Sequence, residues 1–138
     1  MVRSEVSKKN KYYISKNRFY ELRYFCRQYI TWKKAIDVID GYSTNPEYAE
    51  VINRYTKCVH GDPTARAAEL RCKYVANIEL IERIAKETDP IIGNYILHAV
   101  SHGLSYDKIR ARFDIPCSKD TYYDLYRKFF YLLDIARD

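Results

Sequence analysis

The chain of 138 residues has little glycine and proline, four of each. Sheet proteins need many tight turns, and low-complexity tracts are often rich in these residues, so neither class is expected. No run approaches the roughly 20 apolar residues that span a bilayer, and no apolar segment follows the basic N-terminus as it would in a secretory signal. We therefore expect an ordered protein located in the cytoplasm.

The sequence also lacks the paired cysteines of a structural zinc site or a redox motif. None of its four cysteines forms a CxxC pair: Cys26, Cys58, Cys72 and Cys117. His98 and His102 are four residues apart, a spacing that lets two imidazoles share a metal, but no Glu follows His98 as in HExxH. Cys58 and His60 are not spaced like a zinc knuckle. We expect free thiols, no metal site and no cofactor.

Catalytic motifs are missing as well. The chain has no Gly-rich phosphate loop, no GxSxG turn and no acidic cluster for a nuclease metal. A tyrosine recombinase needs Arg, His and Arg side chains ahead of its nucleophile, and the chain is too short to hold that catalytic domain. We therefore predict that the protein is not an enzyme.

What is present is an uneven distribution of charge. The net charge is +6, but Met1 to Lys34 holds ten Lys and Arg against two Glu, or +8, which leaves 14 bases against 16 acids, or −2, for the rest. A basic segment of this kind adds a salt-dependent attraction to nucleic acid. It is equally compatible with a solvated tail that aids solubility.

The hydrophobic periodicity is helical almost throughout. One stripe predicts a helix from Ser15 to Ile39, with Gly41 ending it, and its residues step by three and four: Leu22, Phe25, Tyr29, Trp32, Ile36 and Ile39. Asn45-Pro46 predicts a short helix to about Cys58. Asp62-Pro63 predicts a long helix to about Thr88, because Asp caps the free amides of the first turn and Pro needs no partner there. Its apolar side is formed by Leu70, Tyr74, Ile78, Ile81 and Ala85.

The C-terminal third predicts three more helices. Asp89-Pro90 begins a helix over 90–101 that Gly103 ends, and Ser105 caps a short helix through Phe113 with Ile109 and Phe113 facing inward. Asp114 lies at the bend, where a left-handed backbone is expected. Ser118 caps the last helix, and its inward stripe is Tyr122, Tyr126, Phe129 and Leu133. We predict an all-α single domain with a basic arm at 1–14, a helical body at 15–88 and a helix-turn-helix unit at 89–138.

The segment "SYDKI", Phe113, Ile115 and "DTYYDLYRKF" is similar to helix-turn-helix motifs of sigma-factor-like and phage regulators. Together with "RFYELRYFCRQY", it resembles the phage and mobile-element regulators of Gram-positive bacteria that are grouped with late-gene activators of the RinA and ArpU type. The turn departs from the motif, since Arg110 and Asp114 replace the usual alanine and glycine and "IPCSKD" is about two residues longer. The resemblance implies a promoter-binding regulator in a bacterial host cell.

Double-stranded DNA is therefore the expected partner, bound by a homodimer or larger assembly because one short helix reads only a few base pairs. The expected DNA contacts come from the basic N-terminus and the two C-terminal helices: Lys8, Lys9, Lys11, Lys108, Arg112, Lys119, Thr121, Tyr123, Arg127 and Lys128. Asp120 and Asp124 oppose this interpretation, because carboxylates are repelled by phosphate.

Two alternatives stay open. A small-terminase-like packaging protein would also combine a helix-turn-helix with helical assembly. A host-directed inhibitor, such as an anti-CRISPR protein or a binder of RNA polymerase, would use the basic and aromatic surface against a host protein or the nucleic acid bound to it. A helix pair joined by a short turn is also common in helical proteins that read no DNA.

Overall fold

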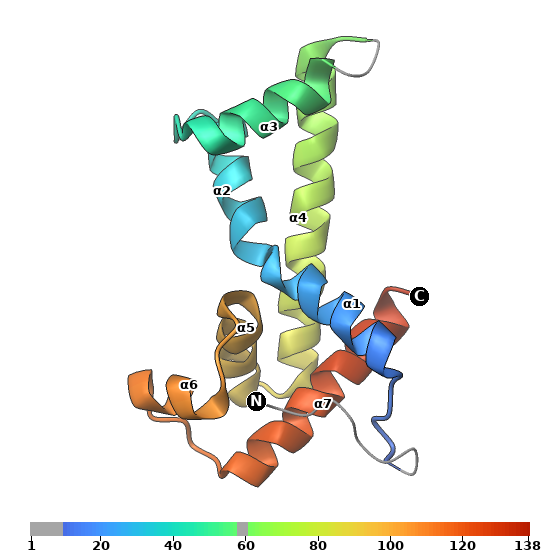
Figure 1. Cartoon of the computed structure of the whole chain (residues 1–138), viewed down its shortest axis with the longest axis vertical. Helices are drawn as coiled ribbons and strands as arrows, with labels where there is room; N and C mark the ends of the chain where they lie inside the picture. The colour runs from blue at the N-terminus through green and yellow to red at the C-terminus, as the bar shows by residue number, and fades with distance from the viewer. Residues whose placement is uncertain (1–9, 58–60) are drawn as a thin grey trace. The chain divides into compact units, whose positions relative to one another are not determined.

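The computed structural model describes residues 10–57 and 61–138, and over these residues it contains helices and turns but no strand (Figure 1). The all-α prediction is confirmed. The described helices are α1 (Lys16–Arg27), α2 (Tyr29–Ile39), α3 (Pro46–Lys57), α4 (Pro63–Thr88), α5 (Ile92–His102), α6 (Tyr106–Arg112) and α7 (Lys119–Ala136). Among the described helices, none combines the length and the apolar character that a membrane span requires.

The predicted capping residues begin the helices as expected. The Asp62 carboxylate accepts a hydrogen bond from the Thr64 N–H at 3.0 Å, and α4 runs from Pro63 to Thr88 as predicted. Asp89 accepts from the N–H groups of Ile91 and Ile92 at 2.9 and 2.8 Å. These donors hold the pKa of the Asp89 carboxyl below its ordinary value, because they stabilise its charged form.

The expected single helix over 15–39 is wrong. The chain forms two helices, and Gln28 between them donates its N–H to the carbonyls of Cys26 and Phe25, which tightens the last turn of α1. The stripe is apolar on both sides of this break, but its halves pack on different helices. α1 contacts α5 and α7, whereas α2 contacts α3. Periodicity reports that a face is buried and does not report what buries it.

Two compact units share the chain. The first unit comprises the residues up to Gln28 together with Leu80–Asp138, and the second unit is Tyr29–Glu79. The second unit is closed by a small core of Ala35, Ile52 and Leu70, against which Val38, Ile39, Tyr48 and Tyr74 pack. Arg71 of α4 and Asp40 after α2 pair across it, with 2.7 Å between Nε and Oδ1.

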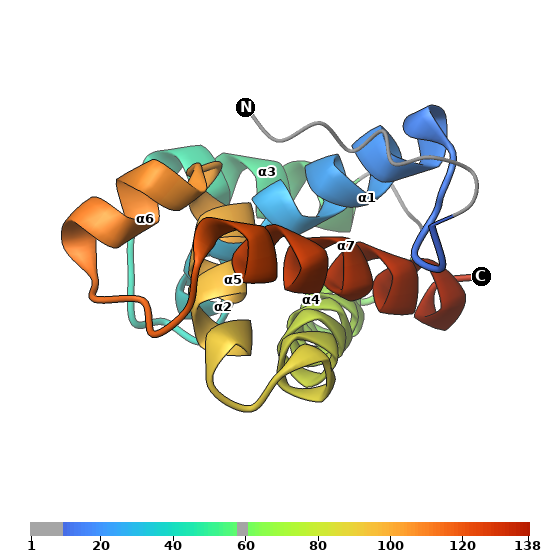
Figure 2. The same ribbon diagram turned by 90° about the horizontal axis from the view of Figure 1, so that it is seen from below.

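The first unit has a core of large aromatic and aliphatic side chains. α1, α5 and α7 pack against one another, and α6 joins α5 (Figure 2). The predicted inward stripe of α7 is confirmed, since Tyr122, Phe129 and Leu133 are fully buried and Tyr126 nearly so. Phe130 is also buried and stacks edge-on against Phe19 of α1 at 4.9 Å between ring centroids. α7 therefore buries a wider face than the stripe indicates.

The connection between α6 and α7 differs from the expectation in two respects. Ile109 is buried as predicted, but Phe113 is 41% exposed, and Ile115 in the connection is buried instead. No described residue other than glycine has a positive φ, so Asp114 does not adopt the left-handed backbone expected at the bend. Six residues lie between the two helices, which is enough chain to turn without a left-handed residue.

Two glycines, one within α5 and one directly after it, allow close packing within the first unit. Gly103 ends the helix with φ of 68°, and the space where a Cβ would lie is filled by the guanidinium of Arg27. Gly93 lies against the backbone carbonyl of Ala85 in α4, again where a Cβ would lie. The first glycine was predicted from the helix end. The second has no local signal, because only the approach of another helix requires it.

Candidate nucleic-acid interface

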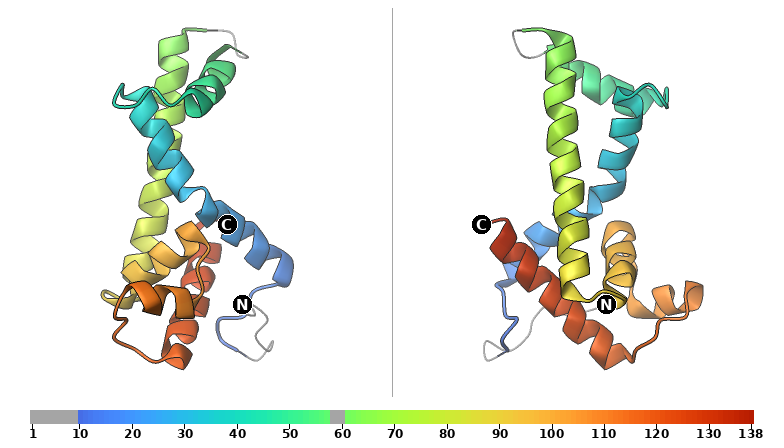
Figure 3. Two further views of the ribbon diagram at one scale, coloured as in Figure 1. Left: turned by 60° about the vertical axis from the view of Figure 1, so that its left-hand side comes forward. Right: turned by 180° about the vertical axis from the view of Figure 1, so that it is seen from behind.

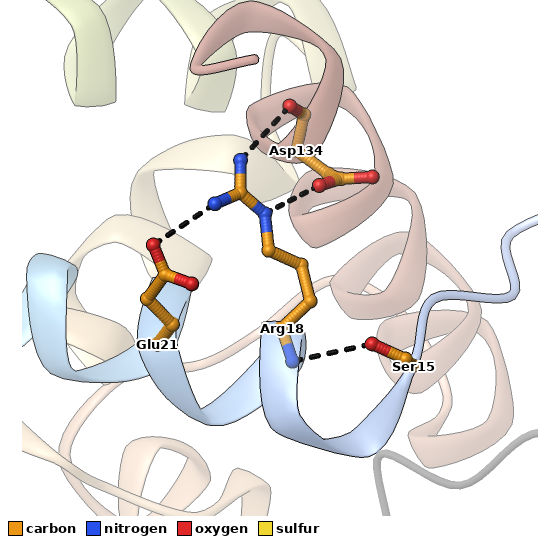
Figure 4. Close-up of polar contacts among 4 residues, drawn as sticks. All are labelled: Ser15, Arg18, Glu21 and Asp134. Atoms are coloured by element: carbon orange, nitrogen blue, oxygen red, sulfur yellow. Dashed lines mark hydrogen bonds and ion pairs between the residues drawn. The ribbon is translucent and has the colours of Figure 1, made fainter.

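The arginines of α1 lie in two different environments. Arg18 is bound on both sides: its Nε donates to Asp134 Oδ1 at 2.6 Å, and its Nη1 donates to Glu21 at 2.9 Å (Figure 4). Arg23 and Arg27, farther along the helix, form no ion pair and no side-chain hydrogen bond with any described residue. Two of the three arginines of α1 therefore have no described partner and can meet an external anion.

These two free arginines meet the corner between α5 and α6. Arg27 lies over Gly103, the C-cap residue of α5. Arg23 lines a hollow of about 290 Å³ together with Lys108 of α6 and Ser105, which caps α6. The remaining lining is Ala99, Val100, Gly103, Leu104 and Tyr126. The hollow therefore has two basic side chains and no carboxylate in its wall.

α6 adds more positive charge beside the hollow. Three of its seven residues are basic, namely Lys108, Arg110 and Arg112. All three are exposed, and none forms an ion pair or a side-chain hydrogen bond with a described residue. Lys108 and Arg112 are one turn apart on the same face. Of the residues predicted to bind DNA, these two are therefore presented to solvent.

The start of α7 is tied to α6 through its polar side chains. Lys119 pairs with Asp107 of α6 at 3.3 Å, and Tyr123 accepts a hydrogen bond from the Tyr106 N–H at 3.2 Å. Thr121 completes the helix cap, since its N–H donates to Ser118 Oγ and its hydroxyl accepts from it. Tyr106 also donates to the Cys117 carbonyl at 3.0 Å. These bonds fix the corner between the two helices.

Arg127 and Lys128 lie farther along α7 and are half-buried. Lys128 donates to the carbonyl of Thr88 at the end of α4, at 3.1 Å. Arg127 borders a small hollow with Tyr12 and Ile14, and its Nε is buried with no partner among the described residues. Both side chains are therefore partly occupied by contacts inside the first unit.

The predicted contacts in the N-terminal segment divide at the edge of the described residues. Lys8 and Lys9 lie outside them. Lys11 is exposed, and its ammonium lies over the ring of Tyr12 at 4.9 Å from the centroid. It therefore keeps its charge available to solvent.

The candidate interface is centred on Arg23, Arg27 and Lys108, which we call the basic corner. Arg23 and Arg27 were missed as site residues because they alternate with aromatic residues that form a core face. A sequence signal for them exists. Arg18 has Glu21 three residues later, whereas neither Arg23 nor Arg27 has an acid three or four residues away in either direction.

The outer face of α5 carries a second hollow, of about 500 Å³, lined by Pro90, Ile91, Asn94, Tyr95, His98 and Phe113. Ile91 is 63% exposed. The His98 ring stacks on His102 at 4.3 Å between centroids and meets Phe113 edge-on at 5.1 Å. Burial, His102 and Arg112 together lower the pKa of His98, because each disfavours the protonated ring.

Among the residues that the structure describes, no third ligand joins the two histidines in a metal site. Over residues 10–57 and 61–138, no group of three or more His, Cys, Asp or Glu side chains is arranged to hold an ion. Cys58 and His60, the other ligands considered from the sequence, lie outside the described residues.

Comparisons with known proteins add no relative to this picture. No family model matches the chain, and no curated protein and no solved structure matches it.

Proposed function

We propose that the protein is a sequence-specific DNA-binding regulator, of phage or mobile-element origin as the sequence resemblance implies. The observation that carries the proposal is the basic corner, where α1 and α6, about 80 residues apart in sequence, bring together cations that form no ion pair with a described residue. Like charges gathered in this way repel one another unless an anion lies between them. A nucleic acid backbone supplies such anions in a row.

The arrangement of α6 and α7 supports a helix-turn-helix mode of binding. In that mode the first helix crosses the DNA backbone while the start of the second enters the major groove. α6 is short and basic, as a backbone helix should be. The start of α7 exposes Lys119, Asp120, Thr121 and Asp124, a mixed set suited to base edges, since a carboxylate can accept from the cytosine amine.

Charge divides the work between the helices. Ser101 to Asp138 holds seven bases against six acids, only +1, so α7 supplies little general attraction to DNA. In the proposed complex α1, α6 and the N-terminal segment contact phosphates and set the position on the duplex. The start of α7 then supplies the sequence preference.

Fluorescence anisotropy with labelled duplexes tests the proposal. Duplexes enriched from a random pool should bind more tightly than random duplex at the same salt concentration, and all affinities should fall steeply as salt rises. If no enriched duplex exceeds random DNA at low salt, the regulator function is wrong. The mass in solution tests the expected homodimer or larger assembly, and a ring of many subunits would favour the packaging alternative.

The hollow on α5 favours the protein-binding alternative to a limited degree. Ile91 and Phe113 are exposed around it, and exposed apolar groups that gather around a hollow are typical of binding sites. Replacing Ile91 with Ser should leave DNA binding unchanged if the basic corner is the functional surface. Loss of function in the host with DNA binding intact would favour the alternative.

A further inference from the structure

The hollow of the basic corner has the features of a binding site for a single anion. Arg23 and Lys108 reach it from different helices, and neither is neutralised by a described carboxylate. Ser105 also lines it. Its Oγ accepts the Lys108 N–H at 3.3 Å, which leaves the hydroxyl hydrogen free to donate to a bound group. A forked guanidinium, an ammonium and a hydroxyl are the donors that phosphate sites use.

We propose that this hollow binds one phosphate group, shared between Arg23 and Lys108, and that the phosphate belongs to the DNA backbone. The inference rests on the proposed function and adds to it one specific binding site for a phosphate, in place of a general attraction to DNA. A backbone phosphodiester offers two non-bridging oxygens and a free phosphate monoester offers three, and both accept from these donors, so the two sources are separated by experiment.

The surroundings of the hollow favour the polymer as the source. Positive charge continues from it in two directions, because Arg27 is one turn beyond Arg23 on α1 and Arg112 is one turn beyond Lys108 on α6. A single small phosphate would leave these outer cations without an anion. A strand of phosphates would meet them in turn. The exposed positions of Lys108 and Gly103 keep the hollow open to solvent.

The salt dependence of duplex binding tests the sharing directly. We expect Arg23→Gln and Lys108→Gln each to weaken binding by about tenfold and to lower the slope of log affinity against log salt by about one. The double variant should also lower the slope by about one, since both side chains neutralise the same phosphate. A decrease of about two in the slope of the double variant would mean that each side chain contacts its own phosphate, and would overturn the shared binding site.

Matched variants guard against effects of net charge and folding. Arg110→Gln removes one charge from the same helix but lies two residues from Lys108, which turns it away from the hollow, so it should leave the slope unchanged. Arg23→Lys keeps the charge and loses the fork, and it should restore the slope but only part of the affinity. If Arg110→Gln lowers the slope as much as Lys108→Gln, the phosphate-binding site is not specific and the inference is wrong.

Titration with inorganic phosphate separates the two sources. At constant ionic strength, the amide NMR signals of Leu104 and Ser105 should move with phosphate and not with chloride, and Lys108→Gln should abolish the movement. If the protein binds phosphate but no duplex, DNA is not the source of the bound phosphate and the proposed function is wrong, while the phosphate-binding site itself is supported. If the protein binds duplex, but phosphate moves no amide signal and both Gln variants keep the salt slope, the phosphate-binding site is wrong and the proposed function is not affected.

Discussion

Arg18 and Asp134 join the first described helix of the chain to the last. The guanidinium donates from Nε to the Asp134 carboxylate at 2.6 Å and from Nη2 to the Asp134 backbone carbonyl at 3.4 Å (Figure 4). Glu21 holds the guanidinium from the other side, and these hydrogen bonds raise the pKa of Arg18. One arginine of α1 is thereby used for structure, whereas Arg23 and Arg27 are not.

We expect Arg18→Gln to lower the free energy of unfolding by about 0.5 to 1 kcal/mol, because the pair is partly exposed and screened by water. Urea unfolding monitored by helical circular dichroism measures the change. Arg83→Gln is the control, since Arg83 pairs with Glu87 on the exposed surface of α4 and should cost less, about 0.3 kcal/mol. Equal losses in both variants would mean that the bond to Asp134 contributes nothing beyond a surface ion pair.

Gly93→Ala should destabilise the protein more than any other glycine substitution tested. The added Cβ would collide with the backbone carbonyl of Ala85, which cannot move without shifting α4, and overpacking of this kind costs about 1 to 3 kcal/mol. Gly41→Ala is the comparison. Gly41 has φ of 83° but no atom within 4 Å of the new Cβ, so only backbone strain of about 1 kcal/mol is expected. A smaller loss for Gly93→Ala than for Gly41→Ala would contradict the close approach of α5 and α4.

Tyr122→Phe should leave stability unchanged or raise it by up to about 1 kcal/mol. The Tyr122 hydroxyl is fully buried and has no hydrogen-bond partner among the described residues, so removing it relieves the cost of desolvation. Tyr106→Phe should instead cost about 1 kcal/mol, because the Tyr106 hydroxyl donates to the Cys117 carbonyl. Thermal and urea unfolding of the two variants provide the test. A loss above 1 kcal/mol for Tyr122→Phe would indicate that a buried water satisfies its hydroxyl.

Much of the fold could be predicted from the sequence, because helix ends depend on local chemistry. Ser105, Ser118, Asp62 and Asp89 cap or begin helices where the sequence placed them, since a side-chain oxygen and a nearby free N–H are local partners. The break at Gln28 could not be predicted. It follows from the partners that the two halves of the stripe find in the fold, and those partners come from distant parts of the chain.

The candidate site was less predictable for a similar reason. Lys108 and Arg112 were identified from the motif, but the other cation that lines the hollow with Lys108 is Arg23, which lies 85 positions earlier. Nothing within one helix indicates that α1 packs against α5 (Figure 3). Tyr123 and Lys128 show the converse. Their side chains suit a partner by type, but they bond to Tyr106 and Thr88 within the first unit.

Stability should fall as the pH decreases from 7.5 to 5.5, and His98 should cause the decrease. Its folded pKa is lowered, so below the ordinary value of about 6.5 the unfolded chain binds a proton that the folded chain does not. The free energy of unfolding therefore rises with pH across this window, and above it His98 no longer favours the unfolded chain. Urea midpoints at several pH values measure the slope.

His98→Gln removes the titrating ring and should flatten that slope. Asp89 does not interfere, because its pKa lies below the ordinary value of about 3.9 and its contribution is lost only at lower pH. An unchanged slope in His98→Gln would show that the folded ring takes up its proton as readily as the unfolded one, contrary to the stacking against His102 and Phe113.

Arg27→Gln should have the opposite consequences to Arg18→Gln, although both remove one positive charge from α1. Arg27 is exposed and has no ion pair with a described residue, so the free energy of unfolding should change by less than about 0.5 kcal/mol. Its guanidinium lies over Gly103, which lines the hollow, so the affinity for every duplex should fall, and the salt slope should decrease by about one. Arg18→Gln should leave both unchanged, since Arg18 is already neutralised by Asp134 and Glu21. Anisotropy titrations of the two variants at three salt concentrations give the comparison. If both variants weaken DNA binding equally, net charge alone sets the affinity, and the basic corner is not a specific contact surface.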